Sequence, residues 1–164
     1  GGMDCAVIFL SRSRTFLAAS AVGLCDRARE LAVEFLANRE HYGKPLIAQP
    51  AIRNLLSPLE TELRAAWLLA CSSAAEWEAG NYGLQASSMA KMYAAQVAGR
   101  FTSSMMDLFG GWGFTKEFEI ERLFRDAKLY EFIEGPSFVQ QAIIAKELLS
   151  GVARGAVAPL KEAA

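Results

Sequence analysis

The sequence contains little cysteine and a single histidine. Cys5, Cys25 and Cys71 form an odd, widely spaced set, which excludes a disulfide framework and favours a reducing compartment. Their apolar neighbours predict that these cysteines are small buried hydrophobic residues. Because His41 is the only histidine, a zinc site built from several histidines is excluded, and we expect no metal site.

The chain also lacks an excess of charge of either sign and a long uncharged apolar run. Seventeen Lys and Arg residues balance eighteen Asp and Glu residues, so the formal net charge is -1. This balance supplies no attraction for nucleic acid, whose phosphates require a basic excess. The longest uncharged apolar run, Ala65 to Ala75, is too short to span a bilayer. Asp4 stands where a signal peptide would carry a basic residue, so we expect a cytoplasmic protein, or a mitochondrial matrix protein if the source is eukaryotic.

Apolar residues recur with the spacing of helices along most of the chain. They do so over residues 24–35, 55–70, 89–108, 123–127 and 139–148. Glycine and proline separate these runs at residues 43–45, 80–83 and 110–114. Pro58 is expected to kink the second helix unless that helix begins nearby. The sequence therefore predicts an all-α fold, an antiparallel bundle of long helices over residues 1–150, followed by a frayed tail over 151–164.

Two of the breaks between helical runs carry residues suited to binding or chemistry. The segment GGWGF at 110–114 removes Cβ atoms where a backbone could approach a ligand closely, and it equally fits a loop that ends a helix. In Glu134-Gly135-Pro136, a carboxylate with apolar neighbours lies at a helix start, an environment that suits a general base. Taken alone, the same glutamate also fits a residue that only caps the helix.

Four ordered motifs resemble those of the acyl-CoA dehydrogenases, the FAD enzymes that introduce a 2,3-double bond into acyl thioesters. The segment REHYGKPL at 39–46 is similar to the R-x-Q-F-G-x-P-I loop of that family. The other three motifs are the glycine loop FGGWGFTKE at 109–117, the segment ERLFRDAK at 121–128, and IEG at 133–135, which resembles Y-E-G-T. The resemblance runs from about Met3 to about Leu149 and implies the C-terminal helical domain of the family.

The resemblance implies a catalytic role for Glu134. In many members, a glutamate at this place removes the α-proton of an acyl-CoA or carrier-tethered acyl thioester while a hydride leaves the β-carbon for FAD. Other members carry the base on the first helix, immediately before an arginine. Here the residue before Arg14 is Ser13, which cannot serve as that base. The resemblance also places Arg14 and Gly135 at the substrate.

The resemblance further implies contacts with the FAD of a neighbouring subunit. Arg39 and Tyr42 stand at family positions that reach this cofactor, and Gly110 and Gly111 stand where the glycine loop meets its diphosphate. An arginine suits a pyrophosphate, and a glycine lets the backbone approach it. A homodimer or a tetramer of two dimers is therefore expected.

Several positions depart from the family pattern. Asp107 replaces the usual Gln before the glycine loop, Pro136 replaces a Thr that commonly contacts FAD, and Phe138 replaces a polar contact. Two smaller departures are His41 in the first loop and Gln49-Pro50 in place of an F-Q pair. These changes leave three interpretations: altered FAD binding, a partner subunit that supplies the missing contacts, or a specialised branch of the family.

The length adds a second set of alternatives. Family members carry an N-terminal helical domain and a β-domain before the helical domain, and 164 residues are too few for all three. The chain also starts with Gly1-Gly2 rather than Met, so we expect either a fragment of a longer dehydrogenase or a natural split subunit. A non-catalytic assembly subunit, forming a hetero-oligomer with a flavin-bearing chain, is the alternative function.

Overall fold

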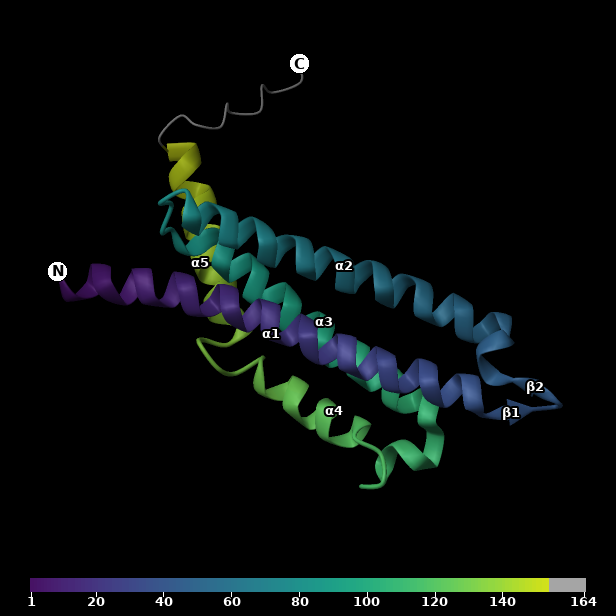
Figure 1. Ribbon diagram of the computed structural model, residues 1–164. Coiled ribbons are helices and arrows are strands. Elements are labelled where there is room, and N and C mark those ends of the chain that lie inside the picture. Colours follow the sequence, from purple (N-terminus) through teal and green to yellow (C-terminus); the bar gives the residue numbers. More distant parts are fainter. Residues whose placement is uncertain (154–164) are drawn as a thin grey trace, which may run out of the picture.

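The computed structural model describes residues 1–153, and these residues form a bundle of helices (Figure 1). The α-helices are α1 (Gly2–Asn38), α2 (Pro50–Glu78), α3 (Leu84–Phe109), α4 (Ile120–Leu129) and α5 (Ser137–Ala153). Short elements join them: β1 (Glu40–His41), β2 (Lys44–Pro45), and the 3-10 helices η1 (Leu46–Ala48) and η2 (Gly110–Phe114). The predicted all-α class is confirmed. The predicted tail overlaps the last turn of α5 and otherwise lies outside the described residues.

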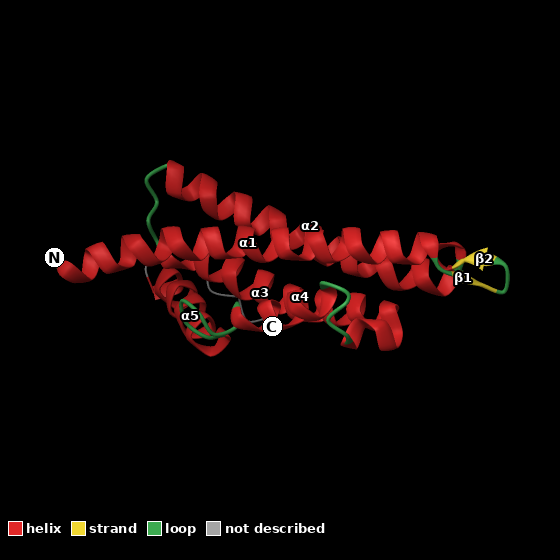
Figure 2. Ribbon diagram, turned by 60° about the horizontal axis from the view of Figure 1, so that its bottom comes forward, coloured by secondary structure: helices red, strands yellow, loops and turns green. Residues whose placement is uncertain are grey.

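The three long helices lie side by side, and α3 is central among them. It packs against α1, α2, α4 and α5, and α5 crosses the long helices steeply (Figures 1 and 2). Much of the core between α1 and α3 is alanine, which lets the two helices approach closely. The buried alanines are Ala18, Ala21, Ala28, Ala32, Ala90, Ala94, Ala95 and Ala98.

The predicted apolar runs match the core best on α3. Val97, Phe101 and Met105 are fully buried there. On α2 the predicted helix is present, but Leu55 and Trp67 of its apolar run are 39% and 40% exposed. Among the described residues α2 lies at the side of the bundle and packs mainly on α1, α3 and η1, so its outer positions face away from the other long helices.

The turns follow the predicted breaks, with two differences. Residues 40–45 form a small antiparallel hairpin in which Tyr42 and Gly43 have φ values of 51° and 71°. Residues 110–114 form the 3-10 helix η2 instead of an irregular loop. Pro58 lies inside α2, and the helix continues through it from Pro50 to Glu78.

The cysteines are only partly as predicted. All three are free, as expected, but only Cys25 is buried, while Cys5 and Cys71 are exposed. The prediction from apolar neighbours fails because Cys5 lies in the exposed first turns of α1 and Cys71 lies on an exposed face of α2. Burial raises the pKa of the Cys25 thiol to about 12.

One helix in the described part of the chain, α1, is long and apolar enough to cross a membrane by length and composition. The prediction from uncharged runs did not single it out, because Arg12 and Arg14 interrupt its apolar sequence. Buried helices of soluble proteins share this length and composition. In this fold one face of α1 is buried against α3.

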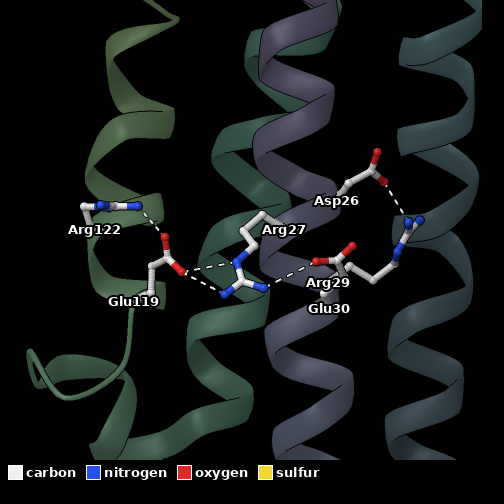
Figure 3. A network of polar contacts seen from close by, with 6 residues as sticks. All are labelled: Asp26, Arg27, Arg29, Glu30, Glu119 and Arg122. Carbon is white, nitrogen blue, oxygen red and sulfur yellow. Dashed lines mark hydrogen bonds and ion pairs between the residues drawn. The ribbon is translucent and has the colours of Figure 1, made fainter.

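Ion pairs connect α1 to its neighbours on the surface of the bundle. Arg27 pairs with Glu119 at the start of α4, at 3.0 Å, and Glu119 also contacts Arg122 (Figure 3). Arg29 pairs with Asp26 on its own helix (Figure 3) and with Glu60 of α2, at 2.8 Å. Exposed pairs of this kind contribute about 0–1 kcal/mol each, so they orient α4 and α2 more than they stabilise the fold.

Candidate active site

The turn between α4 and α5 holds Glu134 in an uncommon backbone conformation. Glu134 has φ 56° and Gly135 has φ 98°, two consecutive residues in the left-handed region. Only glycine adopts this region without strain, so the surroundings must hold Glu134 there. Pro136 then ends the turn, and its carbonyl accepts hydrogen bonds from the first N–H groups of α5.

The carboxylate of Glu134 faces the first helix. The Ser13 hydroxyl donates a hydrogen bond to Oε2 of Glu134 at 2.8 Å, and Glu134 is half-buried. Ser13 cannot act as a base itself, but its hydroxyl contacts the carboxylate of Glu134, the residue that the sequence indicates as the base. Arg14, the next residue on α1, donates from Nε to the main-chain carbonyl of Glu134 at 3.1 Å.

The sequence-predicted residues Glu134, Gly135 and Arg14 are therefore brought together. Arg14 is 3% exposed, and its Nη1 donates to the Ser88 hydroxyl on α3. Burial lowers the pKa of the Arg14 guanidinium, and the nearby Glu134 opposes part of that change. The catalytic and substrate-binding roles of these residues stay predictions.

Sequence reasoning missed two further polar residues at this turn. Lys91 of α3 donates to the Gly135 carbonyl at 2.7 Å, and Gln140 of α5 donates to the Glu134 and Gly135 carbonyls at 3.0 and 2.9 Å. Burial lowers the pKa of the Lys91 ammonium, and the charge on Arg14 lowers it further. The signal for Lys91 was available, because it falls on the same helical face as the small residues Ser87 and Ala94.

A second group of predicted residues lies at the other end of α1. Arg39 follows the helix and Tyr42 lies at the tip of the hairpin, where it is 93% exposed. The Arg39 guanidinium lies over the Phe35 ring, and both residues line a groove of about 770 Å³. Phe109, the last residue of α3, also lines this groove and stacks on Phe35 at 4.3 Å between ring centroids.

The predicted glycines lie just beyond Phe109. Gly110 and Gly111 are exposed, and a Cβ at either position would meet nothing within 4 Å. An exposed guanidinium and open backbone are groups that suit a diphosphate. Asp107, one turn earlier on α3, is also exposed and adds a negative charge to the same end of the helix.

The two groups of residues are well separated within one chain. Arg14 and Arg39 are separated by 25 positions of a continuous helix, which corresponds to roughly 37 Å. Figure 1 shows the hairpin at one end of α1 and the turn before α5 toward the other. Among the described residues, no group of three or more His, Cys, Asp or Glu side chains could hold a metal ion.

Comparison with known proteins assigns the family. The profile of the family described as "Acyl-CoA dehydrogenase, C-terminal domain" matches residues 1–149. The chain belongs to this family. A 3-(aryl)acrylate reductase of Clostridium sporogenes is 36% identical over 148 residues, which cover 90% of this chain and 39% of that protein.

Two further relatives support the assignment to the acyl-CoA dehydrogenases. The mitochondrial short/branched chain specific acyl-CoA dehydrogenase of Rattus norvegicus is 34% identical over 147 residues, 90% of this chain and 34% of that protein. The structure of butyryl-CoA dehydrogenase from Megasphaera elsdenii superposes with a TM-score of 0.87 at 32% identity, covering 90% of this chain and 39% of that one. The chain therefore spans less than two-fifths of the length of these relatives.

The departures from the acyl-CoA dehydrogenase pattern fall in both regions. Pro136 directly follows the Glu134–Gly135 turn, and its ring removes an N–H. Phe138 is 70% exposed at the start of α5, so its ring is not part of the core of this chain. Asp107 lies beside the predicted diphosphate contacts.

Proposed function

We propose that this chain is the C-terminal helical part of an FAD-dependent acyl-CoA, or acyl-carrier, dehydrogenase with Glu134 as the catalytic base. The observation that carries the proposal is the position of the Glu134 carboxylate. It is half-buried at the junction of α1, α3 and α5, in a strained turn held by hydrogen bonds from all three helices. Strained backbone held in this way is concentrated at functional sites.

The chemistry assigned to Glu134 is a proton transfer. The thioester acidifies the hydrogens on the α-carbon, and the carboxylate takes one of them as the Cα–H bond breaks. The Ser13 hydroxyl orients the carboxylate through its hydrogen bond to Oε2, which leaves Oε1 available for the proton. In the reverse direction, which the name of the Clostridium relative describes, the protonated Glu134 would return the same proton.

FAD, when bound, would accept the hydride that leaves the β-carbon. The remaining parts of the cofactor and substrate sites would come from other parts of a longer protein or from a partner chain. The separation of roughly 37 Å between Arg14 and Arg39 supports an arrangement in which Arg39, Tyr42, Gly110 and Gly111 contact the cofactor of a neighbouring subunit. A homodimer would then be the smallest complete enzyme, and a tetramer of two dimers would contain two such units.

The test uses the complete flavin-bearing protein. We expect it to be yellow and to be bleached anaerobically by an acyl-CoA or acyl-carrier thioester. Glu134→Gln should keep FAD and lose this bleaching, because the amide cannot accept the α-proton. Glu147→Gln, the same change at an exposed position of α5, is the matched control and should bleach normally. A Glu134→Gln protein that reduces its flavin at the normal rate would show that the assignment is wrong.

The second candidate function is a non-catalytic assembly subunit that pairs with a flavin-bearing acyl-CoA dehydrogenase chain. It is favoured by the replaced cofactor contacts at Asp107, Pro136 and Phe138. This function predicts co-purification with a second, yellow chain and no FAD in the protein alone. Stoichiometric FAD in a homo-oligomer of the complete protein would exclude it.

A further inference from the structure

Three side chains from three helices converge on two neighbouring main-chain carbonyls. Arg14 of α1 and Gln140 of α5 donate to the Glu134 carbonyl, at 3.1 and 3.0 Å. Lys91 of α3 and Gln140 donate to the Gly135 carbonyl, at 2.7 and 2.9 Å. We refer to Arg14, Lys91 and Gln140 as the carbonyl clamp. None of these hydrogen bonds goes to the Glu134 carboxylate; they fix the backbone that carries it.

Burying the carbonyl clamp has a large desolvation cost. Arg14, Lys91 and Gln140 are 3%, 1% and 0% exposed. In the described part of the chain, neither cation of the clamp forms a direct ion pair. Carbonyl and hydroxyl oxygens accept their hydrogen bonds, and the charge of Glu134 attracts both cations without direct contact. A buried cation without a carboxylate in direct contact is unfavourable compared with an apolar side chain of the same shape. Fold stability alone therefore does not account for Lys91.

Gln140 is costly in a second way. Its amide nitrogen donates to both carbonyls, while its Oε1 is buried without a partner among the described residues. The reverse orientation of the amide would point Oε1 at two carbonyl oxygens, so the backbone turn dictates the orientation observed. The two hydrogen bonds to the turn therefore form at the cost of leaving the Gln140 Oε1 buried and, in the described part of the chain, unpaired.

The clamp explains how Glu134 keeps its left-handed conformation. A residue with a Cβ at φ 56° relaxes to a negative φ unless its neighbours prevent it. Relaxation would rotate the Glu134 carbonyl away from Arg14 and Gln140 and the Gly135 carbonyl away from Lys91. It would also swing the Glu134 side chain away from Ser13.

We propose that Lys91 is a positioning residue for Glu134, acting through the Gly135 carbonyl to hold the carboxylate in its reactive orientation. This inference rests on the proposed function of Glu134 as a base. The hydrogen bond that Lys91 donates goes to a main-chain carbonyl, and Lys91 does not take part in proton transfer itself. Its removal should therefore change turnover and leave substrate binding largely unaltered.

The first experiment tests the contact without any activity. In the full 164-residue chain, Lys91→Met keeps the length of the side chain and removes the charge and the donor. We expect the carbonyl ¹³C resonance of Gly135 and the amide resonances of Glu134 and Gly135 to shift, while the spectrum of the α1–α3 core is retained. Lys146→Met, at an exposed position of α5, is the control and should leave these resonances unchanged. Unchanged turn resonances in Lys91→Met would overturn the proposal, whatever Glu134 does.

The second experiment measures turnover in the complete flavin-bearing protein. Lys91→Met should lower kcat on the order of 10- to 100-fold, the loss expected for a catalytic group displaced by about 1 Å, with KM within about twofold and FAD content unchanged. Gln140→Met removes the other donor to Gly135 and should act in the same direction if Lys91→Met does not fold. Unchanged kcat in both folded variants would overturn the positioning role. An active Glu134→Gln protein would instead overturn the proposed function, and the two failures are distinguished because that variant keeps the clamp.

Discussion

Replacing Gly135 by alanine tests the geometry of the turn with a single methyl group. Gly135 has φ 98°, a conformation that an L-residue with a Cβ rarely adopts. A Cβ built at this position would lie 2.9 Å from Nε2 of Gln140 and 3.5 Å from Nη2 of Arg14. Because Gln140 is 0% exposed and its amide donates to two carbonyls of the turn, moving the amide away breaks these bonds without exchange for bonds to solvent.

The magnitude follows from two separate costs. Holding alanine at this φ costs about 1–3 kcal/mol. Displacing the Gln140 amide weakens its bonds to the Glu134 and Gly135 carbonyls, each with a net value of about 1 kcal/mol. We therefore expect Gly135→Ala to lower the free energy of unfolding by about 3–5 kcal/mol, which corresponds to a fall in Tm on the order of 10 °C for a domain of this size.

Urea titration and thermal unfolding, both followed by far-ultraviolet circular dichroism, measure this loss in the full chain. Gly23→Ala is the matched control, since Gly23 lies exposed in the middle of α1 and a Cβ there meets nothing within 4 Å. Its alanine variant should be more stable than the wild type by about 0.5–1 kcal/mol. A Gly135→Ala chain as stable as the wild type would show that the turn relaxes without cost, and the strain argument for Glu134 would be wrong.

Two further changes test the core. Burial places the pKa of the Cys25 thiol at about 12, above its unfolded value of 9.0. The folded state therefore keeps a proton that the unfolded state releases above pH 9. The free energy of unfolding is unaffected by this group below pH 9 and falls by about 4 kcal/mol in all between pH 9 and 12. Cys25→Ala should remove this alkaline decline in urea titrations at pH 8 and 10, and an unchanged decline would assign it to other groups. Phe101→Ala, at 1% exposure, should cost about 3–5 kcal/mol in the same assay, whereas Phe138→Ala, at 70% exposure, should cost almost nothing; equal losses would contradict the burial of Phe101.

The helical bundle could be predicted from the sequence because its signals are local. The spacing of Val97, Phe101 and Met105 defines one helical face, and the glycines at 80–83 and 110–111 end two helices. The sequence was less informative about α1, where the apolar recurrence was evident only over 24–35 although the helix begins at Gly2. The first turns of α1 are largely exposed, so no apolar stripe marks them.

The candidate site could be predicted only in part, because its polar support is built from distant segments. Glu134 was indicated by its position before Gly135 and by the resemblance. Its bond to Ser13 spans 121 positions and has no local signature. Lys91 is a different case. Its place on the same helical face as small residues is evident in the sequence, but a lysine is by residue type expected to be exposed, so the sequence does not predict its burial.

The geometry of α1 relates the two candidate regions to each other. The helix carries Ser13 and Arg14 at the Glu134 turn and ends at Arg39, beside the groove lined by Phe35 and Phe109. Because α1 runs without interruption between these points and is packed along α3, it acts as a rigid spacer whose length is fixed by its residue count. If Arg39 contacts the cofactor of a neighbouring subunit, as proposed, α1 sets the distance between the two active sites of a dimer. Asp107 lies at the end of this spacer far from the Glu134 turn, so its charge acts on cofactor binding without touching the turn, whereas Pro136 and Phe138 lie at the turn itself.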